Sequence, residues 1–212
     1  MPLVLHSFWR ASAPYRVRIG LNLKGLTYDY ASVDLATGAQ AGESFGTVNA
    51  QRLVPALEVD GRILTQSVAI LEWLEETYPE PALLPRDAFD RQTIRAMSLI
   101  VACDIHPLNN VRILKALARL EVDQADADAW VQRWISDGFA ALEPMIARHG
   151  AGFAFGDAPT LADCMIVPQV YNARRFKVDL SPFPALVAAA DAAALHPAIA
   201  AAHPNNQPDA KA

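Results

Sequence analysis

The sequence is poor in cysteine. Only two cysteines are present among its 212 residues, Cys103 and Cys164, and they lie far apart, without CxxC spacing and without His or Cys neighbours at the spacing of metal ligands. Both stand in apolar segments with helical periodicity. We therefore expect two buried core thiols and no metal site.

The sequence also lacks any run of lysine or arginine, and its formal net charge is −5. General nucleic-acid binding needs clustered positive charge to displace counterions from phosphates, so we expect no nucleic-acid partner. With 52% hydrophobic and 19% charged residues, the composition is that of a soluble globular protein with an ample core. A local basic pocket is compatible with this composition.

Targeting and membrane-spanning patterns are missing as well. The start "MPLVLHSFW" has neither the basic region nor the longer apolar stretch of a signal peptide. The alanine-rich run near residues 185–202 is interrupted by Asp191, His196 and Pro197. We expect a cytoplasmic protein with no membrane contact.

The first 80 residues alternate strand-like and helical patterns. "LVLHSF" and "TYDYASV" resemble strands, and the helix "PYRVRIGLNLKG" between them has Pro14 near its first turn and Gly25 past its end, which predicts a βαβ unit. "ALEVDGRILTQ" predicts a hairpin that turns at Asp60-Gly61, and Ser67 is placed to cap the helix "VAILEWLEETY".

A proline-rich linker at residues 79–87 separates this part from a purely helical one. Helical periodicity predicts helices at 89–103, 107–120, 126–148, 160–174 and 184–195. We therefore predict an α/β domain over residues 1–83 and an all-α domain over residues 88–212.

The turn "RASAP", residues 10–14, joins the first strand to the first helix. It places Ser12 and backbone N–H groups at the positive end of a helix, where charge-assisted hydrogen bonds and the helix dipole stabilise a thiolate. The turn contains no cysteine. A thiolate held here would have to arrive with a ligand.

Two further segments of the first domain allow two interpretations each. Ser67 in "TQSVAI" is either a plain N-cap or part of an anion site for a carboxylate, and only the second interpretation gives Gln66 a role. Pro55 in "LVP" is either an ordinary proline at the start of a strand or a cis-proline that presents the neighbouring backbone to a bound peptide.

In the helical domain, "PTLAD" at residues 159–163 has the form of a capping box, for which we expect a structural role only. The segments "CDIHPLNNVR" and "NARRFKVDL" place polar or basic residues in otherwise apolar helices. Such residues are either satisfied structural groups or ligand contacts.

Over almost its whole length the chain resembles the zeta class of glutathione transferases, which includes maleylacetoacetate and maleylpyruvate isomerases. The resemblance lies in ordered segments: "RVRIGLNLKG", "LVPALEVDG", "QSVAILEWLEETYP", "PALLP", "VPQV", "NARRFKVDLSPFP" and the final "QPD". It implies a thioredoxin-like N-terminal domain that binds glutathione, an all-helical glutathione-transferase C-terminal domain with a pocket for a small acidic substrate, and a homodimer.

The same resemblance implies roles for individual residues. Pro55 is the cis-proline, with the backbone of Val54 paired to the cysteinyl part of glutathione, and Gln66 and Ser67 hold its γ-glutamyl carboxylate. The other implied glutathione contacts are Gln51 and His106. The implied substrate-binding residues are Arg10, Arg112 and Arg175, of which Arg10 and Arg175 are also catalytic, together with Ser12.

One departure from the family pattern concerns the sulfur-binding turn. Zeta proteins usually carry Ser-Ser-Cys after its arginine, whereas this sequence has Ala11-Ser12-Ala13. Ser12 is therefore the only side-chain hydroxyl left in the turn.

We expect a glutathione-dependent cis–trans isomerase of a small dicarboxylic enedione acid, maleylacetoacetate or maleylpyruvate. One alternative is a general glutathione transferase that acts on small electrophiles such as α-halo acids. Another is a non-catalytic module of the same fold that serves in protein association.

Overall fold

The computed structural model describes residues 2–211 and contains two compact units. The first unit combines Met1–Leu83 with Leu195–Ala212, and the second is Leu84–Ala194. Among the described residues, every helix is too short or too polar to span a bilayer.

The first unit contains a mixed sheet in the order β2-β1-β3-β4. Its strands are β1 (Leu3–Ser7), β2 (Asp29–Ser32), β3 (Ala56–Val59) and β4 (Arg62–Thr65). β1 is parallel to β2 and antiparallel to β3, and β3 is antiparallel to β4. The βαβ unit and the hairpin are thus confirmed. Asp60 and Gly61 have φ angles of 48° and 76°, as a two-residue turn of this kind requires.

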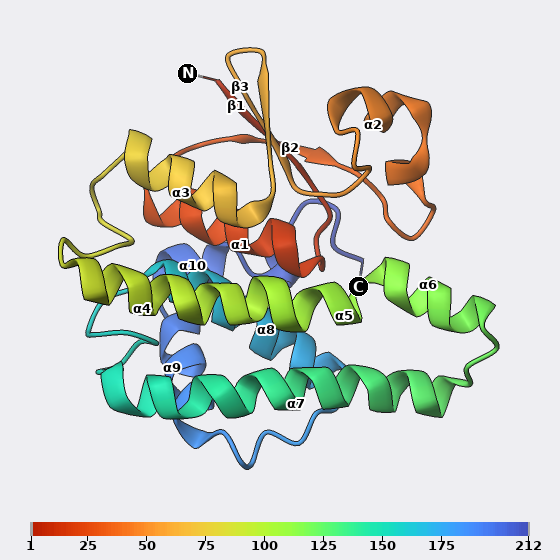
Figure 1. Cartoon of the computed structure of the whole chain (residues 1–212). Coiled ribbons are helices and arrows are strands. Elements are labelled where there is room, and N and C mark those ends of the chain that lie inside the picture. Colours follow the sequence, from red (N-terminus) through yellow and green to blue (C-terminus); the bar gives the residue numbers. More distant parts are fainter. Residues whose placement is uncertain (1, 212) are drawn as a thin grey trace. The chain divides into compact units, whose positions relative to one another are not determined.

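The long helices of this unit, α1 (Ser12–Leu23) and α3 (Ser67–Thr77), lie side by side (Figure 1). They approach closely at Gly20, where an added Cβ would stand 2.2 Å from Leu71 Cδ2. A glycine is therefore needed at this position. The unit's shorter helices are α2 (Glu43–Val48), α10 (Pro197–Ala201), η1 (Ala39–Ala41) and η3 (Pro204–Asn206).

A buried ion pair fixes the end of α1 to α3 and to the linker. Lys24 Nζ lies 2.6 Å from Glu75 Oε2 and donates to the carbonyl of Pro81, also at 2.6 Å. The same Glu75 oxygen accepts the N–H of Leu83 at 2.9 Å. The proline-rich linker predicted from the sequence is therefore anchored at Pro81 by Lys24 and at Leu83 by Glu75.

Breaking this pair is expected to destabilise the protein strongly. Lys24→Met leaves the Glu75 carboxylate buried without its cation, and removal of one partner of a buried pair costs about 3–5 kcal/mol. Denaturant unfolding measures this loss. The control is Arg133→Met, which removes an exposed pair between Arg133 and Asp137 and should cost less than about 1 kcal/mol. Equal effects of the two variants would contradict the assignment.

The last residues of the chain pack in the first unit, not in the second. Asn22 Nδ2 on α1 donates to the carbonyl of Ala198 at 2.9 Å, and Arg18 Nε donates to that of Ala202 at 3.1 Å. The domain limits expected from the sequence, 1–83 and 88–212, therefore differ from the compact units over residues 195–212. Helical periodicity identifies such a segment as a helix but does not say which surface its apolar face covers.

The second unit is all helical, as predicted, with α8 almost completely buried against α4 and α9. Its elements are α4 (Ala88–Leu99), the π-helical η2 (Ile100–Ile105), α5 (His106–Asn109), α6 (Val111–Arg119), α7 (Gln124–His149), α8 (Leu161–Arg175) and α9 (Pro184–Ala194). The break between α5 and α6 falls at Asn110, whose side chain accepts the N–H groups of Arg112 and Ile113 in the first turn of α6. The expected helix 107–120 is therefore two helices.

The prediction of two core thiols is correct only for Cys164. Cys164 is buried in α8, but Cys103 is exposed. Val101 and Ile105, which are one helical turn apart on η2, are both buried. Cys103 lies midway between them in sequence and therefore on the opposite side of the helix.

The capping box at the start of α8 is present, as "PTLAD" predicts. The fully buried carboxylate of Asp163 accepts hydrogen bonds from the N–H of Ala154 at 2.8 Å, and from the N–H and hydroxyl of Thr160 at 2.8 and 2.9 Å. These bonds join the loop before α8 to its first turn. They favour the ionised form, but burial outweighs them and raises the pKa of Asp163 to about 6.

This raised pKa predicts a pH dependence of stability. Between about pH 4 and pH 6 the folded state keeps a proton on Asp163 that the unfolded state has lost, so the free energy of unfolding should fall as the pH rises through this window. Urea unfolding at several pH values measures the slope. Asp163→Asn removes the titrating group, and an unchanged slope in this variant would exclude Asp163 as its source.

Candidate functional site

Among the described residues, the N-termini of the two long helices of the first unit, α1 and α3, lack side-chain caps, as do those of its shorter helices α2 and α10. Within residues 2–211, the N-cap residues of α1 and α3 are Ala11 and Gln66, and neither makes a side-chain capping bond. Three helices of the second unit, by contrast, are capped by the side chains of Asp87, Asn110 and Asp123. The positive ends of α1 and α3 are therefore suited to bind an anion from outside the chain.

The end of α1 offers few donors, and Ser12 supplies two of them. The N–H of Ala11 donates to the carbonyl of Phe8 at 3.1 Å, and Pro14 has no N–H. The first turn thus presents the N–H groups of Ser12 and Ala13, together with the Ser12 hydroxyl. Ser12 is the first residue of the helix and is buried. This small set of donors suits a single sulfur or oxygen anion.

The sequence predicts that Ser67 caps α3. In the structure Gln66 is the N-cap residue, and Ser67 is the first helical residue. The helix begins here because Gln66 adopts a φ of 67°, a strained conformation for a residue with a side chain. Ser67 Oγ accepts a hydrogen bond from Arg16 Nη1 at 3.3 Å. Because the oxygen accepts this bond, the hydroxyl hydrogen can donate to a ligand.

Arg16 is a candidate site residue that the sequence analysis missed. It lies on α1, four residues after Ser12 and therefore on the same face of the helix. Its side chain is buried and reaches Ser67 at the start of α3. A buried guanidinium that joins the two helix ends adds positive charge to both. The four-residue spacing from Ser12 was the signal that could have found it.

The structure brings two of the predicted glutathione contacts together. Gln66 Nε2 donates to Gln51 Oε1 at 2.8 Å, although the residues are 15 apart in sequence. The Gln51 N–H in turn donates to Asn49 Oδ1 at 3.0 Å, and Asn49 Nδ2 donates to the carbonyl of Leu53 at 2.7 Å. The loop that carries Gln51 is thus held in place from within.

The Val54-Pro55 peptide bond is cis, as the resemblance implies. Pro55 stands directly before β3, which is one of the two inner strands of the sheet.

Arg10, in the turn before α1, is exposed. Its guanidinium lies 5.5 Å from the ring centre of Trp9 and 5.9 Å from that of Phe8, so two aromatic rings restrict it.

The remaining predicted residues belong to the second unit. His106 begins α5, directly after the π-helical turn, and Arg112 is exposed in the first turn of α6. Arg175 ends α8, is exposed, and lies 6.0 Å from the ring centre of Tyr171 and 5.8 Å from that of Phe176. Its neighbour Arg174 instead pairs with Asp191 at 2.8 Å. The two adjacent arginines therefore have different surroundings.

Within residues 2–211, no group of three or more His, Cys, Asp or Glu side chains could hold a metal ion. The polar groups of the first unit fit a different kind of ligand. Two positive helix ends and the backbone beside a cis-proline together suit a short peptide that carries a carboxylate and a thiolate.

Comparisons with known proteins agree with this geometry. The model of the glutathione S-transferase N-terminal domain matches residues 12–77, and that of the C-terminal domain matches residues 128–203. A maleylpyruvate isomerase from a Ralstonia species is 52% identical over 193 residues, which cover 89% of this chain and 90% of that protein.

Two solved structures are also similar. A holo structure of maleylpyruvate isomerase, described as a bacterial zeta-class glutathione S-transferase, has 48% identity and a TM-score of 0.96, with all of both chains covered. A maleylacetoacetate isomerase from Anaeromyxobacter dehalogenans, with dicarboxyethyl glutathione and citrate in its active site, has 47% identity and a TM-score of 0.88, covering 100% of this chain and 98% of that one. The chain therefore belongs to the maleylacetoacetate and maleylpyruvate isomerase family of zeta-class glutathione transferases.

Proposed function

We propose that this chain is a glutathione-dependent cis–trans isomerase of a small dicarboxylic enedione acid, maleylpyruvate or maleylacetoacetate. The observation that carries the proposal is that Arg16 joins the uncapped N-termini of α1 and α3, in a chain that is 52% identical to a maleylpyruvate isomerase.

The residues of the first unit fit glutathione by their chemistry. Ser67 and Gln66, at the positive end of α3, would hold its γ-glutamyl carboxylate, with Gln51 beside them. The backbone of Val54, next to cis-Pro55, would pair with the cysteinyl residue. The end of α1, with the Ser12 hydroxyl, would hold the sulfur as a thiolate. His106 remains a predicted contact to the rest of the tripeptide.

Bound glutathione supplies a thiolate that adds to the cis double bond, allows rotation about the resulting single bond, and is released unchanged when the trans acid forms. For this chemistry the chain must lower the pKa of the glutathione thiol. We assign this role to the Ser12 hydroxyl and to the backbone N–H groups of Ser12 and Ala13 at the start of α1. It must also bind the carboxylates of the substrate and stabilise the negative charge that develops on it.

Arginine side chains suit this second task, because the forked guanidinium matches a carboxylate with two hydrogen bonds. We assign it to Arg10, Arg112 and Arg175. The dicarboxyethyl glutathione and citrate in the Anaeromyxobacter relative are both acidic ligands, which supports a pocket for polycarboxylic acids.

The proposal is tested by turnover of maleylpyruvate and maleylacetoacetate with and without glutathione. The isomerase requires glutathione for turnover. A general glutathione transferase would instead conjugate α-halo acids and consume glutathione. A non-catalytic module of this fold would turn over neither class, and failure to bind immobilised glutathione would exclude both enzymes.

The carboxylate subsite can be tested by binding alone. Ser67→Ala removes a hydrogen bond to a charged group, so glutathione should bind about 10- to 150-fold more weakly, corresponding to about 1.5–3 kcal/mol. Calorimetry measures the affinity. Ser136→Ala on α7 is the matched control and should bind glutathione like the unmodified protein. Unchanged affinity in Ser67→Ala would remove Ser67 from the site.

Two further expectations accompany the proposed function, namely a homodimer and a cytoplasmic location. Both come from the sequence and its resemblance to the family, and both stay predictions.

A further inference from the structure

The peptide groups on both sides of Trp9 are held by hydrogen bonds. The N–H of Trp9 donates to Asp209 Oδ2 at 3.2 Å, and its carbonyl accepts from Arg18 Nη2 at 2.8 Å. Trp9 comes three residues before Ser12, at the start of the turn that ends in α1. The chain is thus fixed just before the turn to which we assign the glutathione sulfur.

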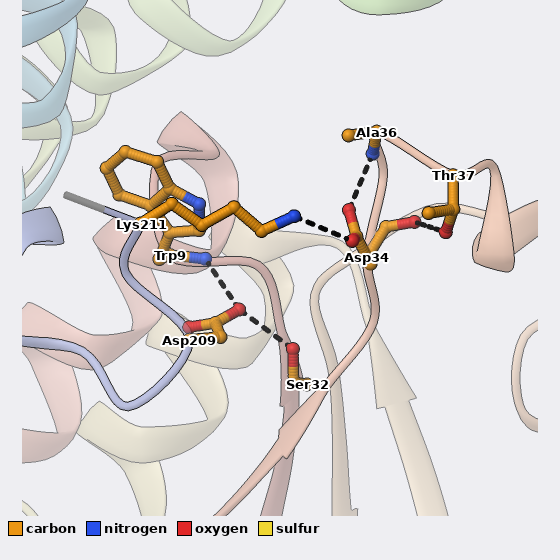
Figure 2. A network of polar contacts seen from close by, with 7 residues as sticks. All are labelled: Trp9, Ser32, Asp34, Ala36, Thr37, Asp209 and Lys211. Atoms are coloured by element: carbon orange, nitrogen blue, oxygen red, sulfur yellow. Dashed lines mark hydrogen bonds and ion pairs between the residues drawn. The ribbon is translucent and has the colours of Figure 1, made fainter.

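Asp209 belongs to the last residues of the chain, and it joins two strand ends (Figure 2). The same oxygen that accepts the Trp9 N–H also accepts the hydroxyl of Ser32 at 2.8 Å. Ser32 ends β2 and pairs with Ser7, the last residue of β1. Asp209 therefore ties the segment after β1 to the end of the neighbouring strand.

Arg18 on α1 also holds the segment that contains Trp9. Its buried guanidinium donates to Ser7 Oγ at 3.1 Å and to the carbonyl of Ala202 at 3.1 Å, besides the bond to Trp9. Its carbon centre lies 5.2 Å from the ring centre of Tyr15. Four contacts leave the guanidinium a single position, so the bond to the Trp9 carbonyl comes from a fixed donor.

A second turn, at residues Phe8–Ala11, connects Trp9 to Ser12. The N–H of Ala11 donates to the carbonyl of Phe8 at 3.1 Å, which closes the segment Phe8–Ala11 into a turn. Trp9 and Arg10 are the two central residues of that turn. Loss of the bond from the Trp9 N–H to Asp209 would therefore remove one of the bonds that hold this turn, so the position of Ser12 would be less well fixed.

We propose that Asp209, in the C-terminal "QPD" segment, is a positioning residue for the sulfur-binding turn and acts through the N–H of Trp9. The proposal rests on the proposed function, because it assumes that glutathione sulfur is bound at Ser12. Asp209 does not touch the ligand in this account. It sets the geometry of the donors that do.

The test compares Asp209→Ala with Asp209→Asn in the full chain. Alanine removes the acceptor of the Trp9 N–H, whereas asparagine keeps an acceptor oxygen there. In Asp209→Ala the pKa of the bound glutathione thiol, followed by ultraviolet titration, should rise, and kcat should fall about 10- to 100-fold, the usual scale for a displacement of about 1 Å. Asp209→Asn should retain most of both properties.

Lys211→Ala controls for a general loss of the C-terminal segment. It removes the neighbouring contact to Asp34, which is 3.2 Å long, without touching Trp9 (Figure 2). This variant should titrate glutathione like the unmodified protein.

The proposal is overturned if Asp209→Ala stays folded and titrates glutathione like the unmodified protein, or if Asp209→Asn and Lys211→Ala lose as much as Asp209→Ala. If Asp209→Ala fails to fold, Asp209→Asn decides, because it keeps an acceptor for the Trp9 N–H, and a fall of about 10-fold or more in its kcat overturns the proposal. Absence of any glutathione thiolate in the unmodified protein would instead overturn the proposed function, so the two failures are distinguishable.

Discussion

Replacing Ser12 with alanine is expected to raise the pKa of bound glutathione and to lower turnover about 10²- to 10³-fold, the usual scale for removal of one donor from a bound anion. The structure explains why the hydroxyl should matter so much here. Ala11 and Ala13 have no polar side chain, the Ala11 N–H is used by Phe8, and Pro14 has none to offer. The hydroxyl is thus one of three donors at this helix end.

Ultraviolet titration of the bound thiolate in Ser12→Ala and in the unmodified protein measures the effect. Ser12→Thr, which keeps a hydroxyl, is the matched control and should retain a low thiol pKa. Superimposable curves for Ser12→Ala and the unmodified protein would remove the hydroxyl from the mechanism. In that case the backbone N–H groups and the helix dipole would hold the thiolate, and turnover would fall only a few-fold.

The second large effect is expected from Arg175→Met. A guanidinium that holds a substrate carboxylate with two charge-assisted hydrogen bonds should contribute about 10²-fold or more to kcat/KM for maleylpyruvate. Glutathione affinity should stay nearly unchanged, because Arg175 is assigned to the other ligand. Steady-state kinetics and calorimetry on the same preparation measure the two quantities separately.

Arg174→Met supplies an adjacent control of the same chemistry. Arg174 is paired with Asp191 at the surface between α8 and α9, so its loss should cost less than about 1 kcal/mol of stability and little activity. Equal losses of turnover in the two variants, or a parallel loss of glutathione affinity in Arg175→Met, would mean that Arg175 has a structural role.

The elements that could be predicted from the sequence are those with local signals. The Asp60-Gly61 turn, the proline near the start of α1 and the periodicity of α7 and α8 all act within a few residues, and the structure has the elements they predict. The cap of α3 could not be assigned correctly from the sequence. A serine before an apolar run is a typical N-cap, which places the start of the helix after Ser67. In the structure the positive φ of Gln66 makes that residue the N-cap, so the helix begins one residue earlier.

Contacts that join distant parts of the chain were the least accessible. The bond between Arg16 and Ser67 spans 51 residues, and that between Trp9 and Asp209 spans 200. No periodicity or spacing predicts such partners, because they depend on how the sheet and helices come together. The proximity of Gln51 and Gln66 and the cis bond at Pro55 were expected only through the family resemblance.

The central claim is that glutathione takes part in the reaction without being used up. The most direct test follows maleylpyruvate and total free glutathione in one reaction with catalytic amounts of enzyme. We expect conversion of the cis acid to the trans acid over many turnovers, no conversion without glutathione, and an unchanged glutathione concentration at the end. Conversion that proceeds equally well without glutathione, or loss of one glutathione for each substrate converted, would contradict it.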